Sequence, residues 1–356
     1  MADIRTTTPP DMDSTGTSGY ETQVDTANDG LAPGTEIFGY QVESLIGRGG
    51  MGSVYLAKQL SLGRAVALKV LHASRIRNPS QVEGFLREAR AAGKLNHPHL
   101  LMVHAVHADA DAGLYCYSME YVPGSTLSRL VKDSGALTRA AALHILYQIA
   151  KALGHAHRNG LIHRDVKPDN ILVMRNGVAK LADLGLVRDR LEGVVSPGSG
   201  GRILSIVGTP DYSAPEQSRN PQRVVPASDV YSLGACLFFM LAGRPPFAGE
   251  TVIDLIVRAA TEPLSFPPAF PADCRALCSR MLAKLPDDRF VDGEHLVAAL
   301  DALAAGRQAP PPVIRTPIPA PEGDDETVEE DEVDETSPAP GGPARRRVVR
   351  RRRRRG

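Results

Sequence analysis

The chain has 356 residues, of which 42% are hydrophobic and 23% charged, a composition typical of a soluble globular protein with a sizeable core. Its four cysteines are too few and too scattered for a disulfide framework, so we expect them to be buried core thiols. The start lacks the apolar segment of a signal peptide, and the longest apolar run, 233–243, is too short to span a bilayer. We therefore expect a cytoplasmic protein with no transmembrane segment in this chain.

The two ends of the chain differ in composition from the middle. Residues 1–37 carry seven acidic side chains and almost no apolar periodicity, which predicts a disordered segment. Residues 307–344 are Pro-rich and acidic, which predicts a disordered linker, and nine arginines follow in the tail 345–356. The folded domain is therefore expected at 38–306.

The first part of this domain shows mainly strand patterns. Strand-like apolar runs fill about 38–75 and 99–122. Between them lies an amphipathic helix at 81–95, for which Ser80 is a candidate N-cap. We expect a small β-rich part at 38–122.

The second part is mainly helical. Thr138 is a candidate cap for a long helix at 139–157, and Asn159-Gly160 is its expected stop. The later patterns are also mostly helical, apart from a Gly/Ser-rich loop at 192–204. A larger α-helical part at 123–306 makes the expected fold class α+β.

A glycine-rich stretch, "IGRGGMGSVY" at 46–55, contains the pattern G-x-G-x-x-G. Alone, the pattern also fits a dinucleotide-binding loop or a flexible turn. A dinucleotide loop opens a helix, whereas this one runs into strand-favouring residues, and a second strand-like run follows at 65–70. We interpret it as the tip of a hairpin over phosphates, where glycines let backbone N–H groups approach closely.

Two further stretches concentrate polar groups that are suited to chemistry. A short loop holds Arg164, Asp165, Lys167 and Asn170 between a helix stop and a strand-like run. In isolation it would be an ordinary surface turn. Asp183 follows between apolar residues, where burying a carboxylate is costly unless a metal or cation partners it.

Together these stretches resemble the eukaryotic-like serine/threonine protein kinase family, in its bacterial branch, over about 38–305. The matching motifs are the Gly-rich loop 47–52, Val66-Ala67-Leu68-Lys69, Glu88, His163-Arg164-Asp165 with Asn170, Asp183-Leu184-Gly185, and Ala214-Pro215-Glu216. Leu184 replaces a phenylalanine of the family pattern, at a packing position that leaves the metal ligand intact. The resemblance implies the bilobal protein kinase fold, with the small lobe at 38–122 and the large lobe at 123–306.

The resemblance also implies roles for the charged residues. Lys69 would bind the α- and β-phosphates of ATP and be held by Glu88. Asp165 would accept or orient the proton of the substrate hydroxyl, and Lys167 would reach the transferring γ-phosphate. Two structural pairs are implied as well, in which Asp229 anchors the catalytic loop and Arg289 pairs with Glu216.

ATP and Mg²⁺, with Mn²⁺ as a substitute ion, are the implied cofactors. The metal ligands would be Asn170 and Asp183. The ATP-binding residues would be Lys69 together with Ile46, Gly47, Arg48, Gly49, Gly50, Met51, Gly52, Ser53, Val54, Ala67, Met119, Glu120, Val122 and Leu172. In this set Met119 resembles a gatekeeper, and the hinge Glu120-Tyr121-Val122 would offer backbone groups to the adenine base.

The implied function is transfer of the ATP γ-phosphate to Ser/Thr hydroxyls of protein substrates in signal transduction. Lys167 indicates a serine/threonine rather than a tyrosine kinase. Autophosphorylation of the activation segment 186–213 is implied too, at Ser205 or Thr209, with Arg164 as the cation that pairs with the phosphate. Self-association would serve this reaction in trans.

Three alternatives remain beside this hypothesis. A pseudokinase or scaffold would bind partners without transfer, although all members of the catalytic set are present. A small-molecule kinase of the same fold is disfavoured by Lys167 and the complete activation segment. The arginine tail 345–356 either contacts anionic lipid or nucleic acid, or is solvated and neutralised by the ten acidic residues at 322–335.

Overall fold

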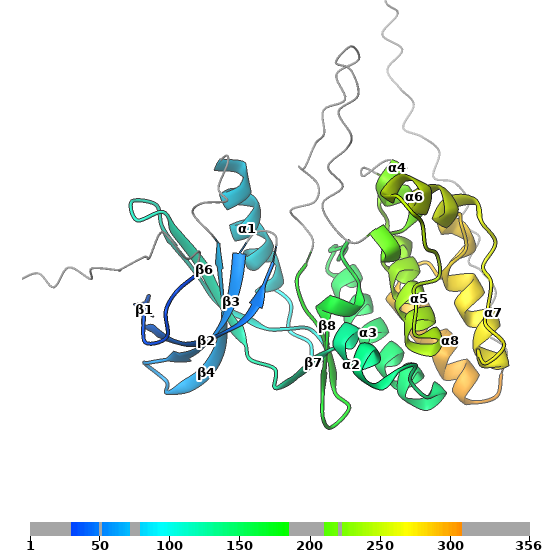
Figure 1. Ribbon diagram of the computed structural model, residues 1–356, viewed down its shortest axis with the longest axis horizontal. Coiled ribbons are helices and arrows are strands. Elements are labelled where there is room, and N and C mark those ends of the chain that lie inside the picture. The colour runs from blue at the N-terminus through cyan, green and yellow to red at the C-terminus, as the bar shows by residue number, and fades with distance from the viewer. Residues whose placement is uncertain (1–29, 50–51, 72–78, 185–209, 220–222, 308–356) are drawn as a thin grey trace, which may run out of the picture. The chain divides into compact units, whose positions relative to one another are not determined.

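The computed structural model describes residues 30–49, 52–71, 79–184, 210–219 and 223–307 (Figure 1). Its strands are β1 (Glu36–Ile37), β2 (Tyr40–Arg48), β3 (Gly52–Gln59), β4 (Arg64–Leu71), β5 (Val103–Asp109), β6 (Leu114–Glu120), β7 (Gly124–Thr126), β8 (Ile171–Met174) and β9 (Ala179–Leu181). Its α-helices are α1 (Pro79–Ala92), α2 (Leu127–Ser134), α3 (Arg139–Arg158), α4 (Pro215–Arg219), α5 (Pro226–Ala242), α6 (Val252–Thr261), α7 (Ala272–Met281) and α8 (Gly293–Ala304). Three 3₁₀ turns are η2 (Pro168–Asn170), η4 (Pro210–Tyr212) and η6 (Pro286–Asp288).

The first part of the chain forms a six-stranded antiparallel sheet in the order β1-β2-β3-β4-β6-β5. Successive side chains of a strand point to opposite faces of the sheet, so alternate residues of β4 pack in different apolar clusters. Val66 and Leu68 join one apolar cluster, whereas Ala67 and Leu71 join another that contains Phe85 of α1. Lys69 has the parity of the second group, so the strand directs it toward the face that α1 covers.

The strands predicted from sequence are confirmed, and two boundaries need correction. Strand β1 lies inside the segment 1–37 that the composition assigned to disorder, and its pairing with β2 extends the ordered chain back toward residue 30. Helix α1 begins at Pro79, so Ser80 lies inside its first turn and is not the N-cap. Proline is well suited to that first position because its missing N–H would have no partner within the helix.

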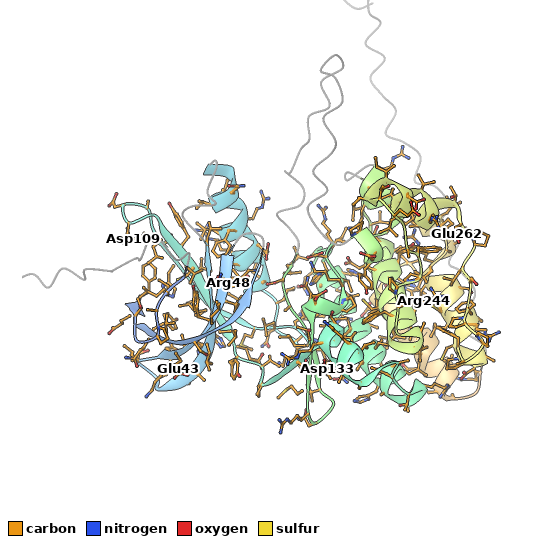
Figure 2. The ribbon with its side chains drawn as sticks, in the orientation of Figure 1. Glu43, Arg48, Asp109, Asp133, Arg244 and Glu262 are labelled. Carbon is orange, nitrogen blue, oxygen red and sulfur yellow. The ribbon has the colours of Figure 1, made fainter. Side chains whose placement is uncertain are left out.

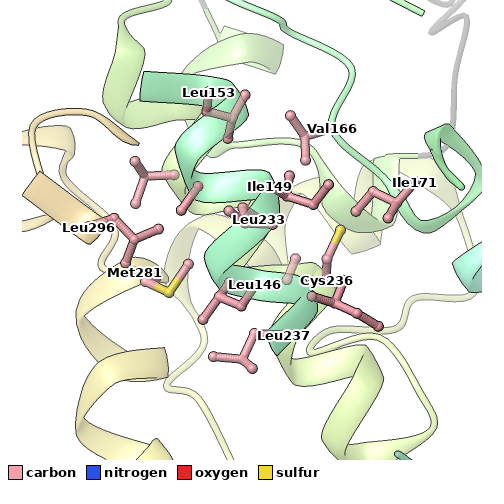
Figure 3. Packing of buried hydrophobic residues seen from close by; sticks show 14 of the residues in the cluster. Leu146, Ile149, Leu153, Val166, Ile171, Leu233, Cys236, Leu237, Met281 and Leu296 are labelled. Atoms are coloured by element: carbon pink, nitrogen blue, oxygen red, sulfur yellow. The ribbon is translucent and has the colours of Figure 1, made fainter. Parts of the chain in front are cut away.

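The helical part is organised around α3 and α5. The Thr138 side chain accepts a hydrogen bond from the Ala141 N–H at 3.3 Å, which confirms the predicted cap of α3. Asn159 caps the other end, and Gly160 follows with a φ of 71° that glycine adopts freely. In Figure 3, α3 and α5 contribute Leu146, Ile149, Leu153, Leu233 and Leu237 to one core.

All four cysteines are free and buried, as expected from the sequence. Among the residues that the structure describes, no helix is both long enough and apolar enough to cross a membrane. Although α5 has the most apolar sequence of the chain, its residues are buried against the other helices of this core.

Helices α3 and α8 approach each other closely through two glycines. A Cβ on Gly293 would lie 2.3 Å from the backbone nitrogen of Gly154, a distance that real side chains do not tolerate. The absence of both side chains therefore lets the start of α8 lie directly on the last turns of α3. This contact brings α8 within reach of His157, which becomes important for the site.

A buried ion pair ties α4 to the chain beyond α7. Arg289, whose side chain is fully buried, donates to both carboxylate oxygens of Glu216 at 2.6 and 2.9 Å. It also donates to the carbonyls of Ala227, Ala283 and Lys284. The predicted pairing of Arg289 with Glu216 is thus confirmed, and every side of the guanidinium has an acceptor.

We expect Glu216→Gln to lower the free energy of unfolding by about 3–5 kcal/mol, because it leaves a buried guanidinium without its carboxylate. Urea unfolding of the two proteins measures the difference. The matched control is Asp273→Asn, which removes an exposed ion pair with Arg139 and should cost less than about 1 kcal/mol. Similar losses in the two variants would contradict this account.

Candidate active site

The Gly-rich stretch forms the end of the β2–β3 hairpin, as predicted. The strands pair in antiparallel register, and the Gly49 N–H donates to the Gly52 carbonyl at 2.8 Å across the turn. Gly50 and Met51 lie outside the described residues. Arg48 is exposed at the end of β2 (Figure 2).

The described glycines of this turn are needed for different reasons. A Cβ on Gly52 would lie 2.1 Å from the carbonyl oxygen of Val70, so strand β4 itself requires glycine there. At Gly47 and Gly49, by contrast, the nearest described atoms to a Cβ would lie at 3.8 and 3.6 Å, an ordinary contact distance. Packing against the described residues therefore does not require glycine at these two positions. A phosphate that comes close to the backbone here would require it.

Lys69 lies among acidic and aromatic side chains. Its Nζ is 2.8 Å from Asp183 Oδ1 and 3.9 Å from Glu88 Oε1. The same ammonium group is 5.6 Å from the centre of the Tyr117 ring. The predicted contact between Lys69 and Glu88 is confirmed, but the closer partner of the lysine is Asp183.

The charges of this cluster influence one another's protonation. Burial alone would lower the pKa of Lys69, but the Asp183 carboxylate and the other acidic neighbours raise it well above its ordinary value. Burial would likewise raise the pKa of Asp183, but Lys69 lowers it overall. Burial raises the pKa of Glu88 to about 8; Lys69 opposes this rise, and Asp183 adds to it. The lysine charge is therefore balanced mainly by Asp183 in this arrangement.

Asp165 is held by two donors from its own loop. Its Oδ2 accepts from Lys167 Nζ at 2.9 Å and from Asn170 Nδ2 at 3.0 Å. The same amide nitrogen of Asn170 donates to the Asp165 carbonyl at 2.8 Å. The spacing of these residues therefore places a carboxylate, an ammonium group and an amide within direct contact of one another.

His163 connects this loop to the strand that ends before Asp183. The Asp165 N–H donates to His163 Nδ1 at 3.3 Å, so the other ring nitrogen, Nε2, carries the proton and donates to the Ala182 carbonyl at 3.1 Å. Burial lowers the pKa of His163, despite the opposing effect of Asp229, and favours this neutral form. The ring thus fixes the backbone at Asp165 relative to the residue that precedes Asp183.

The carboxylate of Asp229, on α5, accepts from the N–H groups of His163 at 2.7 Å and Arg164 at 2.8 Å. The predicted anchoring of the loop by Asp229 is confirmed. Burial would raise the pKa of this group, but its hydrogen bonds lower it overall, so it stays ionised.

A third donor to Asp229 is His157, which the sequence did not identify, since a single histidine at a helix end has no distinguishing spacing. Its Nε2 lies 2.9 Å from Asp229, while its Nδ1 accepts from the Gly293 N–H.

Asn170 and Asp183 are adjacent because the Ala182 N–H donates to the Asn170 carbonyl at 2.8 Å. Both hydrogen bonds of the Asn170 side chain use its nitrogen, which leaves the amide oxygen as the atom suited to a cation. No group of three or more His, Cys, Asp or Glu residues in the described part of the chain is arranged to hold a metal. One carboxylate and one amide fit Mg²⁺, because this ion usually keeps several waters and binds substrate phosphates as well.

The apolar residues expected around the adenine base are mostly brought together. Ala67, Met119 and Val122 are buried in one cluster, with Val54 and Leu172 packed against it. Ser53 is also buried, on β3. Ile46 is 46% exposed and lies outside this cluster.

The hinge is fixed by two contacts of Glu120 that the sequence did not indicate. The Glu120 side chain forms an ion pair with Lys180 of β9 at 2.8 Å, and its backbone N–H donates to the Met102 carbonyl. This N–H is therefore already used and is not the group offered to a base. Of the predicted regulatory residues, Arg164 has a left-handed φ of 66°, while Ser205 and Thr209 lie outside the described residues.

We expect Glu88→Gln to change how stability depends on pH. The raised pKa means that the wild-type protein is stabilised by neutral Glu88 below pH 4.5, and that this stability is lost as the pH rises toward about 8. Glutamine cannot ionise. The free energy of unfolding of the variant, relative to wild type, should therefore increase by up to about 1.4 kcal/mol per pH unit in this window. Denaturant unfolding at several pH values measures it. Glu83→Gln, exposed on the same helix, is the matched control, and a flat difference for Glu88→Gln would contradict the assignment.

Comparison with known proteins agrees with this geometry. The model of the protein kinase domain matches residues 40–298. A protein of Corynebacterium efficiens named "Serine/threonine-protein kinases drp72" is 36% identical over 277 residues, which cover 77% of this chain and 52% of the relative. "Serine/threonine-protein kinase PknB" of Mycobacterium tuberculosis is 36% identical over 283 residues, covering 78% of this chain and 45% of the relative.

A solved structure extends the likeness to the fold. The crystal structure of Rad53 1-466 in complex with AMP-PNP is similar with a TM-score of 0.60 and 26% identity, over 73% of this chain and 64% of that one. The chain spans about half the length of the curated relatives that it matches. With the family model covering most of the chain, and the motifs assembled in one place, the chain belongs to the protein kinase domain family.

Proposed function

We propose that this protein is a serine/threonine protein kinase, which transfers the γ-phosphate of ATP to Ser and Thr hydroxyls of protein substrates. One observation carries the proposal. The Asp165–Lys167–Asn170 cluster and the Lys69–Asp183 ion pair are linked by hydrogen bonds through His163 and Ala182. The names of the relatives support the Ser/Thr class.

ATP is the proposed phosphate donor. The similar Rad53 structure contains AMP-PNP, and the residues of this chain fit such a nucleotide. Gly47 and Gly49 leave room for phosphates beside the backbone, Lys69 supplies a positive charge, and the cluster around Met119 offers an apolar surface for a base. Asn170 and Asp183 would hold Mg²⁺, which would supply charge neutralisation on the phosphates.

The side chains of the loop would act on the protein substrate. Asp165 would orient the hydroxyl and accept its proton, because its carboxylate is held in one orientation by Lys167 and Asn170. Lys167 would stabilise negative charge on the transferring group from its position beside Asp165. Lys69 would bind and orient the phosphates.

A pseudokinase or scaffold is the second candidate, and it is not favoured. The likeness to named serine/threonine kinases covers most of the chain. The charged groups implied by the family motifs are all present, and Lys69 contacts Glu88 and Asp183 while Lys167 contacts Asp165. A protein that only bound partners would not need Lys167 and Asn170 to donate to one carboxylate oxygen of Asp165.

We also propose boundaries for the kinase domain and a role for the C-terminal tail. We propose that the kinase domain extends from about residue 30 to 306, with lobes at about 30–122 and 123–306. The linker 307–344 and the arginine tail 345–356 would then not be needed for catalysis. Nine arginines suit an anionic lipid surface or nucleic acid, and the acidic residues at 322–335 would compete with either partner.

We expect Asp165→Asn and Lys69→Ala to reduce phosphate transfer by about two orders of magnitude or more, because both residues act on charge at the reacting centre. Radiolabel transfer to a generic basic protein, with ATP and Mg²⁺, measures the loss. The controls are Asp133→Asn and Lys132→Ala, both exposed on α2. They make the same chemical changes and should remain fully active. Retained activity in both site variants would contradict the proposed function.

We further expect the purified active enzyme to carry phosphate on Ser205 or Thr209, placed there by a second copy acting in trans. A phosphate on this segment would pair with a cation of the catalytic loop, for which Arg164 is the candidate. Mass spectrometry of wild type, compared with the inactive Asp165→Asn variant, tests this expectation. A fully active enzyme without phosphate on 186–213 would contradict it.

A further inference from the structure

We propose that Gln217 is a positioning residue for phosphate transfer, which fixes the backbone on which Asp165 is carried. The inference rests on the proposed kinase function and adds a residue to it. Gln217 follows the Ala214-Pro215-Glu216 motif and makes its two side-chain hydrogen bonds at the catalytic loop and at Ala214.

The amide of Gln217 bridges two backbone groups. Its Nε2 donates to the Arg164 carbonyl at 2.9 Å, and its Oε1 accepts from the Ala214 N–H at 2.9 Å. A carbonyl can only accept and an N–H can only donate, so the two partners fix which end of the amide faces which. A side chain without both a donor and an acceptor cannot replace it.

The peptide that Gln217 holds is a strained one. Arg164 has a φ of 66°, a left-handed conformation that is strained for a residue other than glycine. Such a conformation persists only where its surroundings enforce it. The Arg164 N–H donates to Asp229, and its carbonyl accepts from Gln217, so the residue is held on both sides. The next residue is Asp165, whose direction depends on this turn.

Gln217 can impose this position because its own backbone is anchored. Glu216, next to it in α4, is bound by the buried Arg289 and by the Ser228 hydroxyl. The described chain resumes at position 210, near the end of the proposed activation segment 186–213, and helix α4 begins five residues later. The end of that segment is therefore tied through one side chain to the residue before Asp165.

The test uses two variants of the full-length enzyme. Gln217→Glu keeps the shape and the acceptor but removes the donor, and Gln217→Ala removes both. We expect each to lower kcat by about tenfold or more, since a small displacement of a reacting group is costly. The Kd for AMP-PNP with Mg²⁺ should remain within about twofold of wild type, because Gln217 touches no residue assigned to the nucleotide.

The pH profile separates a positioning role from a packing role. The carboxyl of Gln217→Glu regains a donor when it is protonated. Its activity relative to wild type should therefore rise as the pH falls toward the pKa of glutamate, roughly 4.3 in solution. Gln217→Ala has nothing to titrate, so its activity relative to wild type should not change with pH. If Gln217 only filled space, alanine would be the more damaging substitution and neither ratio would depend on pH.

Gln148 offers a matched control. Its Nε2 donates to the carbonyls of Gly177 at 2.9 Å and His144 at 3.3 Å, and its Oε1 accepts from the Ala179 N–H at 2.9 Å; none of these hydrogen bonds reaches the catalytic loop. Gln148→Glu should lower the thermal unfolding temperature while leaving kcat near wild type. An inactive wild-type enzyme would overturn the proposed function together with this inference. An active wild type, with kcat unchanged in both Gln217 variants, would overturn this inference alone.

Discussion

The buried carboxylate of Asp229 holds the turn from which the reactive side chains project. It accepts hydrogen bonds from two successive backbone N–H groups, those of His163 and Arg164, and from His157. A buried carboxylate is stable only when donors replace the water that it has lost, and here three donors do so. The left-handed Arg164 is one consequence, since two consecutive N–H groups can point to one carboxylate only if the chain turns sharply between them.

The second organising constraint is electrostatic. Lys69, Glu88 and Asp183 come from three separate elements, and burial disfavours the charge on each of them. Lys69 and Asp183 remain charged because they are in direct contact, whereas Glu88 is 3.9 Å away and its pKa rises. The cluster is therefore held by one strong ion pair and one weaker contact. Phosphates and a metal ion brought to this place would meet charges that are already oriented.

Glycine serves different purposes in different parts of this chain. At Gly52 and Gly293 the nearest backbone of another element leaves no room for a side chain. At Gly47 and Gly49 the described residues leave room for a side chain, and the proposed phosphate ligand would explain why glycine stands there. The motif pattern does not separate these cases, because all that it records is the absence of a side chain. The distances from each position to its neighbours do.

The sequence alone determined a β-rich part followed by a mainly helical one, the cap at Thr138, and the residue types of the site, because these depend on local patterns and short motifs. It did not determine that β1 extends the sheet, since this depends on pairing with β2. The start of α1 was misassigned to Ser80, although proline at a first helical position is a local signal. Only the tertiary structure identified the contacts of Lys180, His157 and Gln217. The bond from Gln217 spans 53 residues of sequence and that from His157 to Asp229 spans 72. Partners so far apart leave no periodic or spacing signal, so the folded chain alone selects them.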